Sequence, residues 1–244
     1  MKTINIWKIN TIAAAIIAGG ITLPTVATAA DATLEEVVVI GSRGAPRSVG
    51  DSPVPVDVID AEELGKAGSN DLLMQLQSAV PSLNVHLQPI SDAASMIRPG
   101  NLRGLSSDST LIMVNGKRRH RASVIAFQGG GVNDGSQGAD ISVIPSIALK
   151  RVEVLRDGAA AQYGSDAVAG VINFILDDSS EGGSLTIKSG EYSKGDGAST
   201  VVAGKIGMSL TDAGFMNLSF QMKENDATSR SMQRPDAQAL IDAG

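Results

Sequence analysis

Residues 151–176, RVEVLRDGAAAQYGSDAVAGVINFIL, place two β-branched runs on either side of a stretch made almost wholly of small residues. The runs RVEVLR and GVINFIL favour β-strands, and AAAQYG between them favours a short helical turn. Alanine and glycine permit close approach of neighbouring backbone. The residues alone thus indicate two strand-like runs on either side of a stretch of small residues.

The same stretch does not have the spacing of a phosphate-binding loop. Between Gly158 and Gly164 there is one residue more than that loop allows, and its lysine is missing. His86 and His120 lie at no spacing typical of a metal pair, and no serine lies in a GxSxG elbow. Residues 133–140, NDGSQGAD, offer calcium-like ligands without the EF-hand spacing. We therefore expect no enzyme, no cofactor and no metal site.

The first residues have the pattern of a secretory signal peptide. Lys2 and Lys8 precede an apolar run at residues 11–23, and ATA at 27–29 fits the small-x-small rule for cleavage. A transmembrane anchor is the alternative, but glycines and a proline interrupt the run, which is shorter than the ~20 residues needed to span a bilayer. We therefore expect residues 1–29 to be removed, which leaves Ala30 as the mature N-terminus.

Charge and cysteine content exclude several classes of protein. Residues 1–29 hold two lysines and no acidic residue, so their removal takes the formal charge from -6 to -8. An acidic chain whose one basic run is KRRHR at 117–121 lacks the basic footprint of a nucleic-acid binder. Without cysteine there is no disulfide framework, thiolate metal site or cysteine nucleophile.

Residues 30–52 read as a flexible arm that is polar except for VVVI at 37–40. One interpretation is that this island is a strand of the domain that follows. The other is that it has no neighbour of its own and adds to the sheet of a partner through main-chain hydrogen bonds.

Residues 53–178 have the pattern of a compact α+β domain, which begins with an edge strand at PVPVDVI. Asp60 and Glu63 form a capping-box pattern for a short helix that Gly68 ends. Asn70 is expected to cap a second helix. The apolar face of the second helix consists of Leu72, Leu73, Leu76 and Val80.

Further strands are predicted at LNVHLQ, MIRPGNLRGL and STLIMVNGKRR, and Asn115–Gly116 marks a turn after the last apolar run. Residues 120–140 form a loop that is long for a compact domain, and such loops are usually functional or disordered. ISVIPSIALKRVEVLR then returns to a strand.

After Asp178 the sequence changes to long segments that alternate between apolar and polar residues. In the first clear segment, one face carries Thr200, Val202, Gly204, Ile206, Met208 and Leu210, and the other carries Ser199, Ala203, Lys205, Gly207 and Ser209. In the next, Met216, Leu218, Phe220 and Met222 alternate with Asn217, Ser219, Gln221 and Lys223. Segments of roughly ten residues with this alternation are typical of transmembrane β-barrels, although a soluble antiparallel sheet gives the same pattern.

Four motifs follow the leader in order: LEEVVVIGSR, LRG at 102–104, TLIMVNGKR at 110–118 and the stretch at 151–176. Together they closely resemble the plug domain of TonB-dependent outer-membrane receptors, over residues 34–178. The resemblance implies an α+β plug domain, with a small mixed β-sheet and short helices, followed by the first antiparallel strands of a transmembrane β-barrel. It also implies that RVEVLR and GVINFIL are strands of the plug sheet, and that the small residues between them pack closely inside the barrel. A plain soluble βαβ unit explains the small residues less well. In that family the plug fills a barrel of about 22 strands.

By the same resemblance, one group of residues is the TonB box, to which the C-terminal domain of TonB binds from the periplasm. This group consists of Glu36, Val37, Val38, Val39 and Ile40.

A second group matches family positions that often form ion pairs between plug and barrel; an ordinary solvated strand edge is the alternative. It consists of Arg103, Arg151, Glu153 and Arg156. A third group lies in the region that faces the incoming substrate, where it would meet an anionic ferric chelate; a solvated turn is the alternative. It consists of Arg119, His120 and Arg121.

The expected organisation is a signal peptide at 1–29, the arm at 30–52, the plug domain at 53–178 and truncated barrel strands at 179–244. The strands are predicted at about 184–192, 199–210 and 215–223, with TDAG at a periplasmic turn. An open barrel edge would leave backbone N–H and C=O groups in lipid without hydrogen-bond partners. We therefore expect this sequence to be a fragment, a truncated gene product or a free plug.

The expected function is energy-coupled uptake of a scarce nutrient across the outer membrane of a Gram-negative bacterium. Ferric siderophores are the default substrate, and cobalamin, oligosaccharides and peptides remain open. The expected partners are TonB, the nutrient ligand and outer-membrane lipid around the barrel. The alternative is a soluble periplasmic module that binds TonB without transporting anything.

Overall fold

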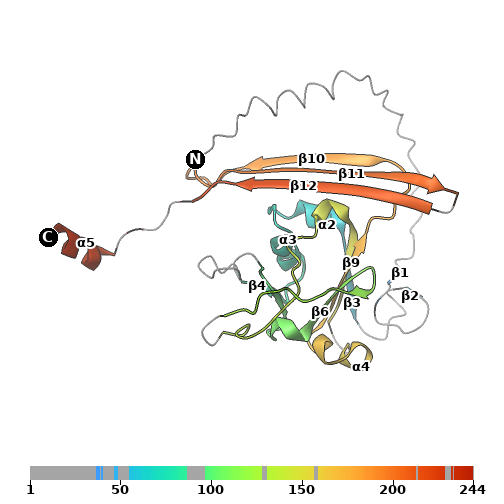
Figure 1. Ribbon diagram of the computed structural model, residues 1–244, viewed down its shortest axis with the longest axis horizontal. Coiled ribbons are helices and arrows are strands. Elements are labelled where there is room, and N and C mark those ends of the chain that lie inside the picture. The colour runs from blue at the N-terminus through green and yellow to red at the C-terminus, as the bar shows by residue number, and fades with distance from the viewer. Residues whose placement is uncertain are drawn as a thin grey trace, which may run out of the picture. The chain divides into compact units, whose positions relative to one another are not determined.

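The structure is a computed structural model that describes residues 37–38, 40, 47–48, 55–86, 97–127, 131–156, 159–212, 214–228, 232 and 234–243 (Figure 1). Its helices and strands in chain order are β1 (Val37–Val38), β2 (Arg47–Ser48), β3 (Val56–Asp60), α2 (Ala61–Lys66), α3 (Leu72–Ala79), β4 (Leu83–Val85), β5 (Gly100–Leu102), η3 (Ser107–Ser109), β6 (Thr110–Val114), β7 (Lys117–Arg118), η4 (Ser146–Ala148), β8 (Leu149–Leu155), α4 (Ala160–Tyr163), η5 (Ser165–Ala167), β9 (Gly170–Leu176), β10 (Gly183–Gly190), β11 (Ser199–Thr211), β12 (Gly214–Asn225) and α5 (Pro235–Asp242). The expected signal peptide and mature N-terminus lie outside the described residues.

A five-stranded sheet with the order β3-β8-β9-β6-β7 forms the centre of the α+β domain. β6 and β9 run parallel, whereas the other neighbouring strands are antiparallel, so the sheet is mixed as predicted. The two β-branched runs of residues 151–176 pair directly as β8 and β9, with Leu155 opposite Val171. The short helical turn predicted between them forms as α4.

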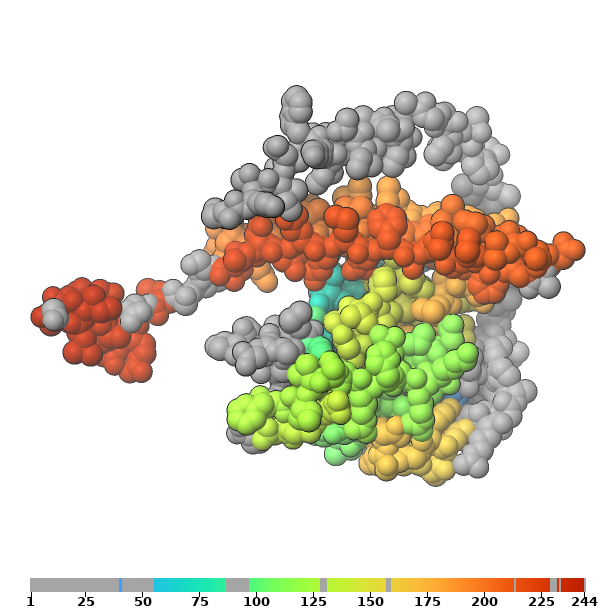
Figure 2. Space-filling view, viewed as in Figure 1, coloured from blue at the N-terminus to red at the C-terminus, as the bar shows by residue number. Residues whose placement is uncertain are grey.

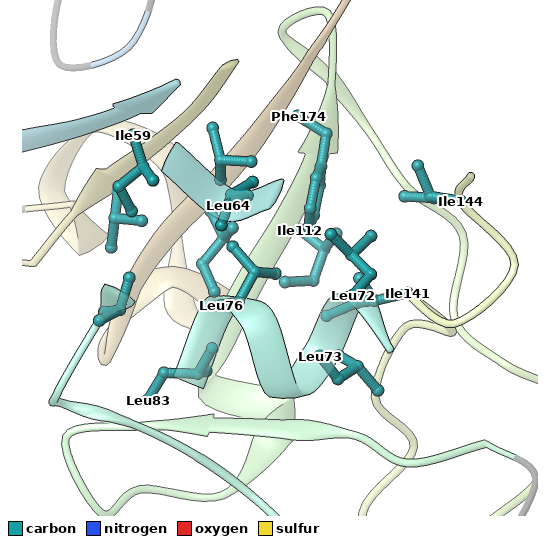
Figure 3. Close-up of a cluster of buried hydrophobic side chains, with 14 of the residues drawn as sticks. Ile59, Leu64, Leu72, Leu73, Leu76, Leu83, Ile112, Ile141, Ile144 and Phe174 are labelled. Carbon is teal, nitrogen blue, oxygen red and sulfur yellow. The ribbon is translucent and has the colours of Figure 1, made fainter. Parts of the chain in front are cut away.

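Both faces of this sheet are buried. On one face α2 and α3 pack against the strands, and Figure 3 shows Leu64 and Leu76 of the helices close to Ile112 of β6. The apolar helix face predicted from Leu72, Leu73, Leu76 and Val80 is buried there. The opposite face is covered by Ile40, Ala159, Ala167 and Tyr163, which pack against Leu111, Met113, Leu155 and Val171.

The first helix forms at the expected place, but its caps differ from the prediction. The Asp60 side chain makes no capping hydrogen bond, so the capping box with Glu63 does not form. The helix ends at Lys66, with Ala67 as its C-cap in an extended conformation. Because the chain has already turned away at Ala67, no left-handed residue is needed at Gly68.

The N-cap of α3 is Asp71 rather than Asn70. Asp71 Oδ1 accepts hydrogen bonds from the backbone N–H groups of Leu73 and Met74, at 3.1 and 3.3 Å. Asparagine and aspartate are equally good caps, so the outcome depends on which side chain faces the first turn.

Within the part of the chain that the structure describes, no helix combines the length and the apolar character needed to cross a membrane.

The small residues between β8 and β9 differ in burial, and Ala160, Ala161 and Gly164 are exposed. Ala159, Ala167 and Ala169 are buried. Gly170 has a φ of 142° and lies against Leu155 and Leu102, where a side chain would collide. The predicted close packing is therefore found at Ala159, Ala167, Ala169 and Gly170 but not along α4, whose alanines are exposed.

The turn predicted at Asn115–Gly116 joins β6 to β7. Both residues have positive φ, 49° and 73°, as a two-residue hairpin turn requires. The described part of residues 120–140 contains no helix or strand. The side-chain amides of Asn133 and Asn101 exchange two hydrogen bonds of 2.6 Å, which ties this loop to β5.

The alternating segments after Asp178 form an antiparallel sheet with the order β10-β11-β12, close to the predicted bounds. Figure 2 shows their side chains as one continuous layer. The outer face is apolar and exposed, with Leu185, Ile187, Ile206, Leu218, Phe220 and Met222. The inner face carries the polar set that includes Lys205, Asn217 and Lys223, and η4 of the α+β domain packs against β11 and β12.

One of the two interpretations of the N-terminal arm is wrong in part. It gave Val37–Val38 no neighbour of its own, but β1 pairs antiparallel with β2, with Val37 opposite Ser48. Because strands pair through main-chain groups, a polar segment such as Arg47–Ser48 can serve as a partner. Its sequence has no apolar pattern that would predict a strand.

Candidate functional site

The α+β domain contacts the inner face of the β10-β11-β12 sheet through polar and charged groups. Asp177, which directly follows β9, forms an ion pair with Lys205 of β11. The Asn217 side-chain amide of β12 donates hydrogen bonds to the carbonyl oxygens of Asp177 and Ser179, at 3.0 and 2.9 Å. These contacts hold the start of the strand region against the end of the domain.

A second contact is centred on Asp71 at the start of α3. Its Oδ2 atom pairs with the guanidinium of Arg98 and lies 3.7 Å from Nζ of Lys223 on β12. Beside it, the Asn70 side chain donates to the hydroxyl of Ser199 on β11, at 3.4 Å. The carboxylate that caps α3 is therefore also the one that faces the strands.

Burial of Asp71 by itself raises the pKa of its carboxyl group. The hydrogen bond and charge of Arg98, the charge of Lys223 and the N–H of Met74 outweigh this effect and hold the pKa below its ordinary value of 3.8. For Asp177, burial again raises the pKa, and Lys205 together with Ser179 lowers it below 3.8. Both carboxylates are thus stabilised in the charged form.

The contact between domain and strands is expected to weaken in acid. Because the pKa of Asp177 is lowered in the folded state, its stabilisation is complete above about pH 4 and is lost as the pH falls further. Hydrogen exchange of the Ser179 amide, which donates to Asp177 Oδ1 at 3.0 Å, measures this loss. In Asp177→Asn the acid-dependent part should disappear; an unchanged pH profile in that variant would contradict the assignment.

Two cavities lie between the domain and the strands. One of about 400 Å³ is lined by Gln75, Ser146 and Lys205 among others. The other, of about 860 Å³, is lined by Arg98, Tyr192 and Lys223 among others. Gln75 is buried and its Oε1 atom has no hydrogen-bond partner among the described residues, which suits a bridging water. The contact combines these polar groups with buried apolar residues of β11, Val201 and Ala203.

The four residues predicted to pair plug with barrel make contacts within the α+β domain. Arg151 donates from Nε and Nη2 to Glu153 Oε1, at 3.0 and 2.9 Å. Arg156 pairs with Asp57, and Arg103 donates to the carbonyl oxygen of Arg156 at 2.7 Å. Their role between plug and barrel stays a prediction.

Glu153 is fully buried and links this ion pair to the Asn115–Gly116 turn. Its Oε2 atom accepts from the Asn173 side chain at 3.1 Å. Asn173 Oδ1 in turn accepts from the backbone N–H of Gly116 at 3.0 Å. A chain of polar contacts across β8 and β9 therefore fixes the hairpin from which the predicted substrate-facing residues emerge.

The predicted substrate-facing residues follow that hairpin but do not form one cluster with the ion pairs above. Arg119, which is partly buried, and His120, which is exposed, line a shallow hollow of about 330 Å³. Arg121 points elsewhere and contacts Asp108 Oδ1 at 3.3 Å, and the same oxygen accepts from the backbone N–H of Gln137 at 2.9 Å. Arg121 thus helps to hold the loop.

The predicted TonB box is only partly described. Glu36 and Val39 lie outside the described residues, and Val37–Val38 form β1. Ile40 is 1 % exposed and packs in the second hydrophobic cluster. Its side chain therefore packs against the α+β domain, and its part in a TonB box stays a prediction.

The residues that join the domain to the strands were not among the predicted site residues. They are Asp71, Asp177, Lys205 and Lys223. The sequence held a signal for the lysines, because both lie on the polar face of the alternating segments. The aspartates had no such signal, since their partners are distant in sequence. Among the described residues, no group of three or more acidic, histidine or cysteine side chains is placed to hold a metal.

The family profile of the TonB-dependent Receptor Plug Domain matches residues 48–171, which is half of the chain. The chain belongs to the TonB-dependent receptor plug domain family. The match covers the central sheet from β3 into β9, so the α+β domain is the plug. This confirms the fold class and the family expected from the four motifs.

The chain is similar to curated receptors and transporters. It is 30% identical to the ferric enterobactin receptor of Pseudomonas aeruginosa over 179 residues, which cover 72% of this chain and 23% of that protein. It is 29% identical to the vitamin B12 transporter BtuB of Photobacterium profundum over 153 residues, or 63% of this chain and 22% of the transporter. The chain thus spans about a quarter of the length of these relatives.

A solved structure supports the same assignment. The crystal structure of the ferric enterobactin receptor PfeA in complex with BCV-L6 has a TM-score of 0.55 and 28% identity to this chain. The similarity covers 70% of this chain and 25% of the receptor. More than the plug alone is therefore shared, since the matched plug residues make up only half of the chain.

Proposed function

We propose that this chain is the plug and first barrel strands of a TonB-dependent receptor that imports a scarce nutrient across the outer membrane of a Gram-negative bacterium. The observation that carries the proposal is the division of the β10-β11-β12 sheet. Its inner face pairs with the plug through Lys205 and Lys223, while its outer face is an exposed apolar layer. Apolar residues toward lipid and polar residues toward the lumen are what a barrel wall requires.

A ferric siderophore is the proposed substrate. The ferric enterobactin receptor of Pseudomonas aeruginosa and the solved receptor PfeA support this choice, and the similarity to a vitamin B12 transporter keeps cobalamin as the second candidate. Arg119 and His120 beside the plug hairpin would face such an anionic chelate. The protein acts by binding and gating, and the proposal includes no catalytic step.

Uptake by intact cells tests the proposal. Deletion of the gene that carries this sequence should abolish uptake of 55Fe-labelled ferric enterobactin and leave 57Co-cobalamin uptake unchanged. If only cobalamin uptake is lost, the substrate is cobalamin and not a ferric siderophore. If neither uptake changes and the protein fractionates with the periplasm, the alternative of a soluble module that binds TonB would stand instead.

TonB is proposed to add a strand to β1. In the described residues β1 pairs with β2 on one edge, and a further strand added to the other edge would be held by main-chain hydrogen bonds. Proline removes a backbone donor and fixes φ, whereas threonine keeps both donor and extended backbone. Each ladder bond contributes only about 0.5 to 1.5 kcal/mol, so proline must prevent several pairs at once.

We therefore expect Val38→Pro to weaken binding of the purified TonB C-terminal domain more than about tenfold, and Val38→Thr to change it by less than about threefold. Isothermal titration calorimetry with the purified protein measures both. Equal affinity of wild type and Val38→Pro would exclude strand addition at β1.

A further inference from the structure

The two oxygens of the Asp71 carboxylate serve different parts of the molecule. Oδ1 accepts from the backbone N–H groups of Leu73 and Met74 and so caps the first turn of α3. Oδ2 faces two cations, Arg98 of the plug and Lys223 of the barrel strand β12. A single side chain thereby connects helix folding within the plug to the contact with the wall.

The three charged side chains are neither exposed nor fully buried. The exposed fractions are 21% for Asp71, 15% for Arg98 and 28% for Lys223. Solvent therefore screens these charges less than it screens a surface ion pair, so the attraction of Asp71 to its two cations is stronger. The large desolvation cost of a fully buried ion pair is avoided. Lys223 lies at 3.7 Å, the long end of the ion-pair range, so this contact opens more easily than the one with Arg98.

Arg98 extends the connection to the loop on the same side of the plug. It lies two residues before β5, where Asn101 exchanges hydrogen bonds with Asn133 of the 120–140 loop. A carboxylate held by Arg98 is thus tied to the strand that holds this loop.

We propose that Asp71 is a latch: docking of Lys223 on its Oδ2 atom holds the carboxylate in the orientation in which Oδ1 caps α3. When the plug moves away from β12, the carboxylate loses one of its two cations and the first turn of α3 opens more often. In this way movement of the plug would change the stability of α3 and of the 120–140 loop that Arg98 is tied to. This role rests on the proposed transport function.

Hydrogen exchange of the full 244-residue chain in detergent micelles tests the latch. Lys223→Met removes the charge but keeps most of the apolar stem. It should speed exchange of the Leu73 and Met74 amides roughly two- to fivefold, the range of a partly exposed ion pair. In an Asp71→Asn background, which keeps a capping oxygen but no charge, the same substitution should have no further effect.

Lys205→Met is the matched control, because Lys205 lies on the same face of the sheet and pairs with Asp177 instead. It should speed exchange of the Ser179 amide and leave Leu73 and Met74 unchanged. The latch is refuted if Lys223→Met leaves Leu73 and Met74 unchanged, or if its effect persists in Asp71→Asn. Neither TonB nor a ligand enters this experiment, so its failure and a negative uptake result are distinguishable.

Discussion

Gly170→Ala is expected to destabilise the plug by more than about 3 kcal/mol, the upper range for overpacking combined with backbone strain. A Cβ atom at this position would meet the carbonyl oxygen of Leu155 well inside contact distance and Leu102 Cδ2 at 2.6 Å. The carbonyl belongs to β8, the neighbour of β9 in the sheet, and Leu102 is fully buried, so neither group has room to move. The φ of 142° adds strain for any residue with a side chain.

Urea unfolding followed by far-ultraviolet circular dichroism measures this loss. Gly65→Ala is the control, since Gly65 lies in α2 and a Cβ there has no atom within 4 Å. Alanine in a helix is favoured over glycine by about 1 kcal/mol at most, so the control should be neutral or more stable. An unchanged unfolding midpoint for Gly170→Ala would show that the β8–β9 contact is looser than described.

Arg151→Met should cost about 3 to 5 kcal/mol of plug stability, the usual penalty for removing one partner of a buried ion pair. Glu153 is fully buried and accepts two hydrogen bonds from Arg151 on one oxygen. Without the guanidinium, the carboxylate keeps Asn173 but faces no charge from Arg151. The loss should also loosen the Asn115–Gly116 turn, because Asn173 holds Gly116.

The double variant Arg151→Met with Glu153→Gln should be more stable than Arg151→Met alone by at least about 1 kcal/mol, since a neutral amide is less costly to bury and still accepts from Asn173. Lys66→Met serves as the exposed control: the pair with Glu62 is well solvated, and its loss should change stability by less than about 1 kcal/mol. Equal stability of the single and double variants would contradict the role assigned to the buried charge.

Elements with a strong local pattern were predictable from the sequence. β8, β9 and β11 follow from β-branched runs or alternation, and the Asn115–Gly116 turn follows from the positive φ that these residues tolerate. The partner of β1 was not predictable, because Arg47–Ser48 pairs through the main chain and shows no apolar pattern.

Contacts between distant residues were less predictable, as the caps and the ion pairs show. Asp60 has the better capping-box sequence but makes no capping hydrogen bond, whereas Asp71 caps α3 and also faces Arg98 and Lys223, which are distant in sequence. The sequence assigned Lys205 and Lys223 to the polar face of the barrel strands, but it held no information on which acidic residue of the plug would meet each of them.

The order of strands in the plug sheet sets a folding problem. β3 comes first in the sheet, yet its neighbour is β8, so that Val56 pairs with Leu155, 99 positions later in the chain. The parallel pair of β6 and β9 likewise joins Leu111 to Val171. Contacts between residues so far apart require the loss of much chain entropy before any stabilisation is gained, which slows folding to the millisecond-to-second range. A chain that emerges N-terminus first must therefore keep β3, α2 and α3 without their sheet partner until residues 149–155 have followed.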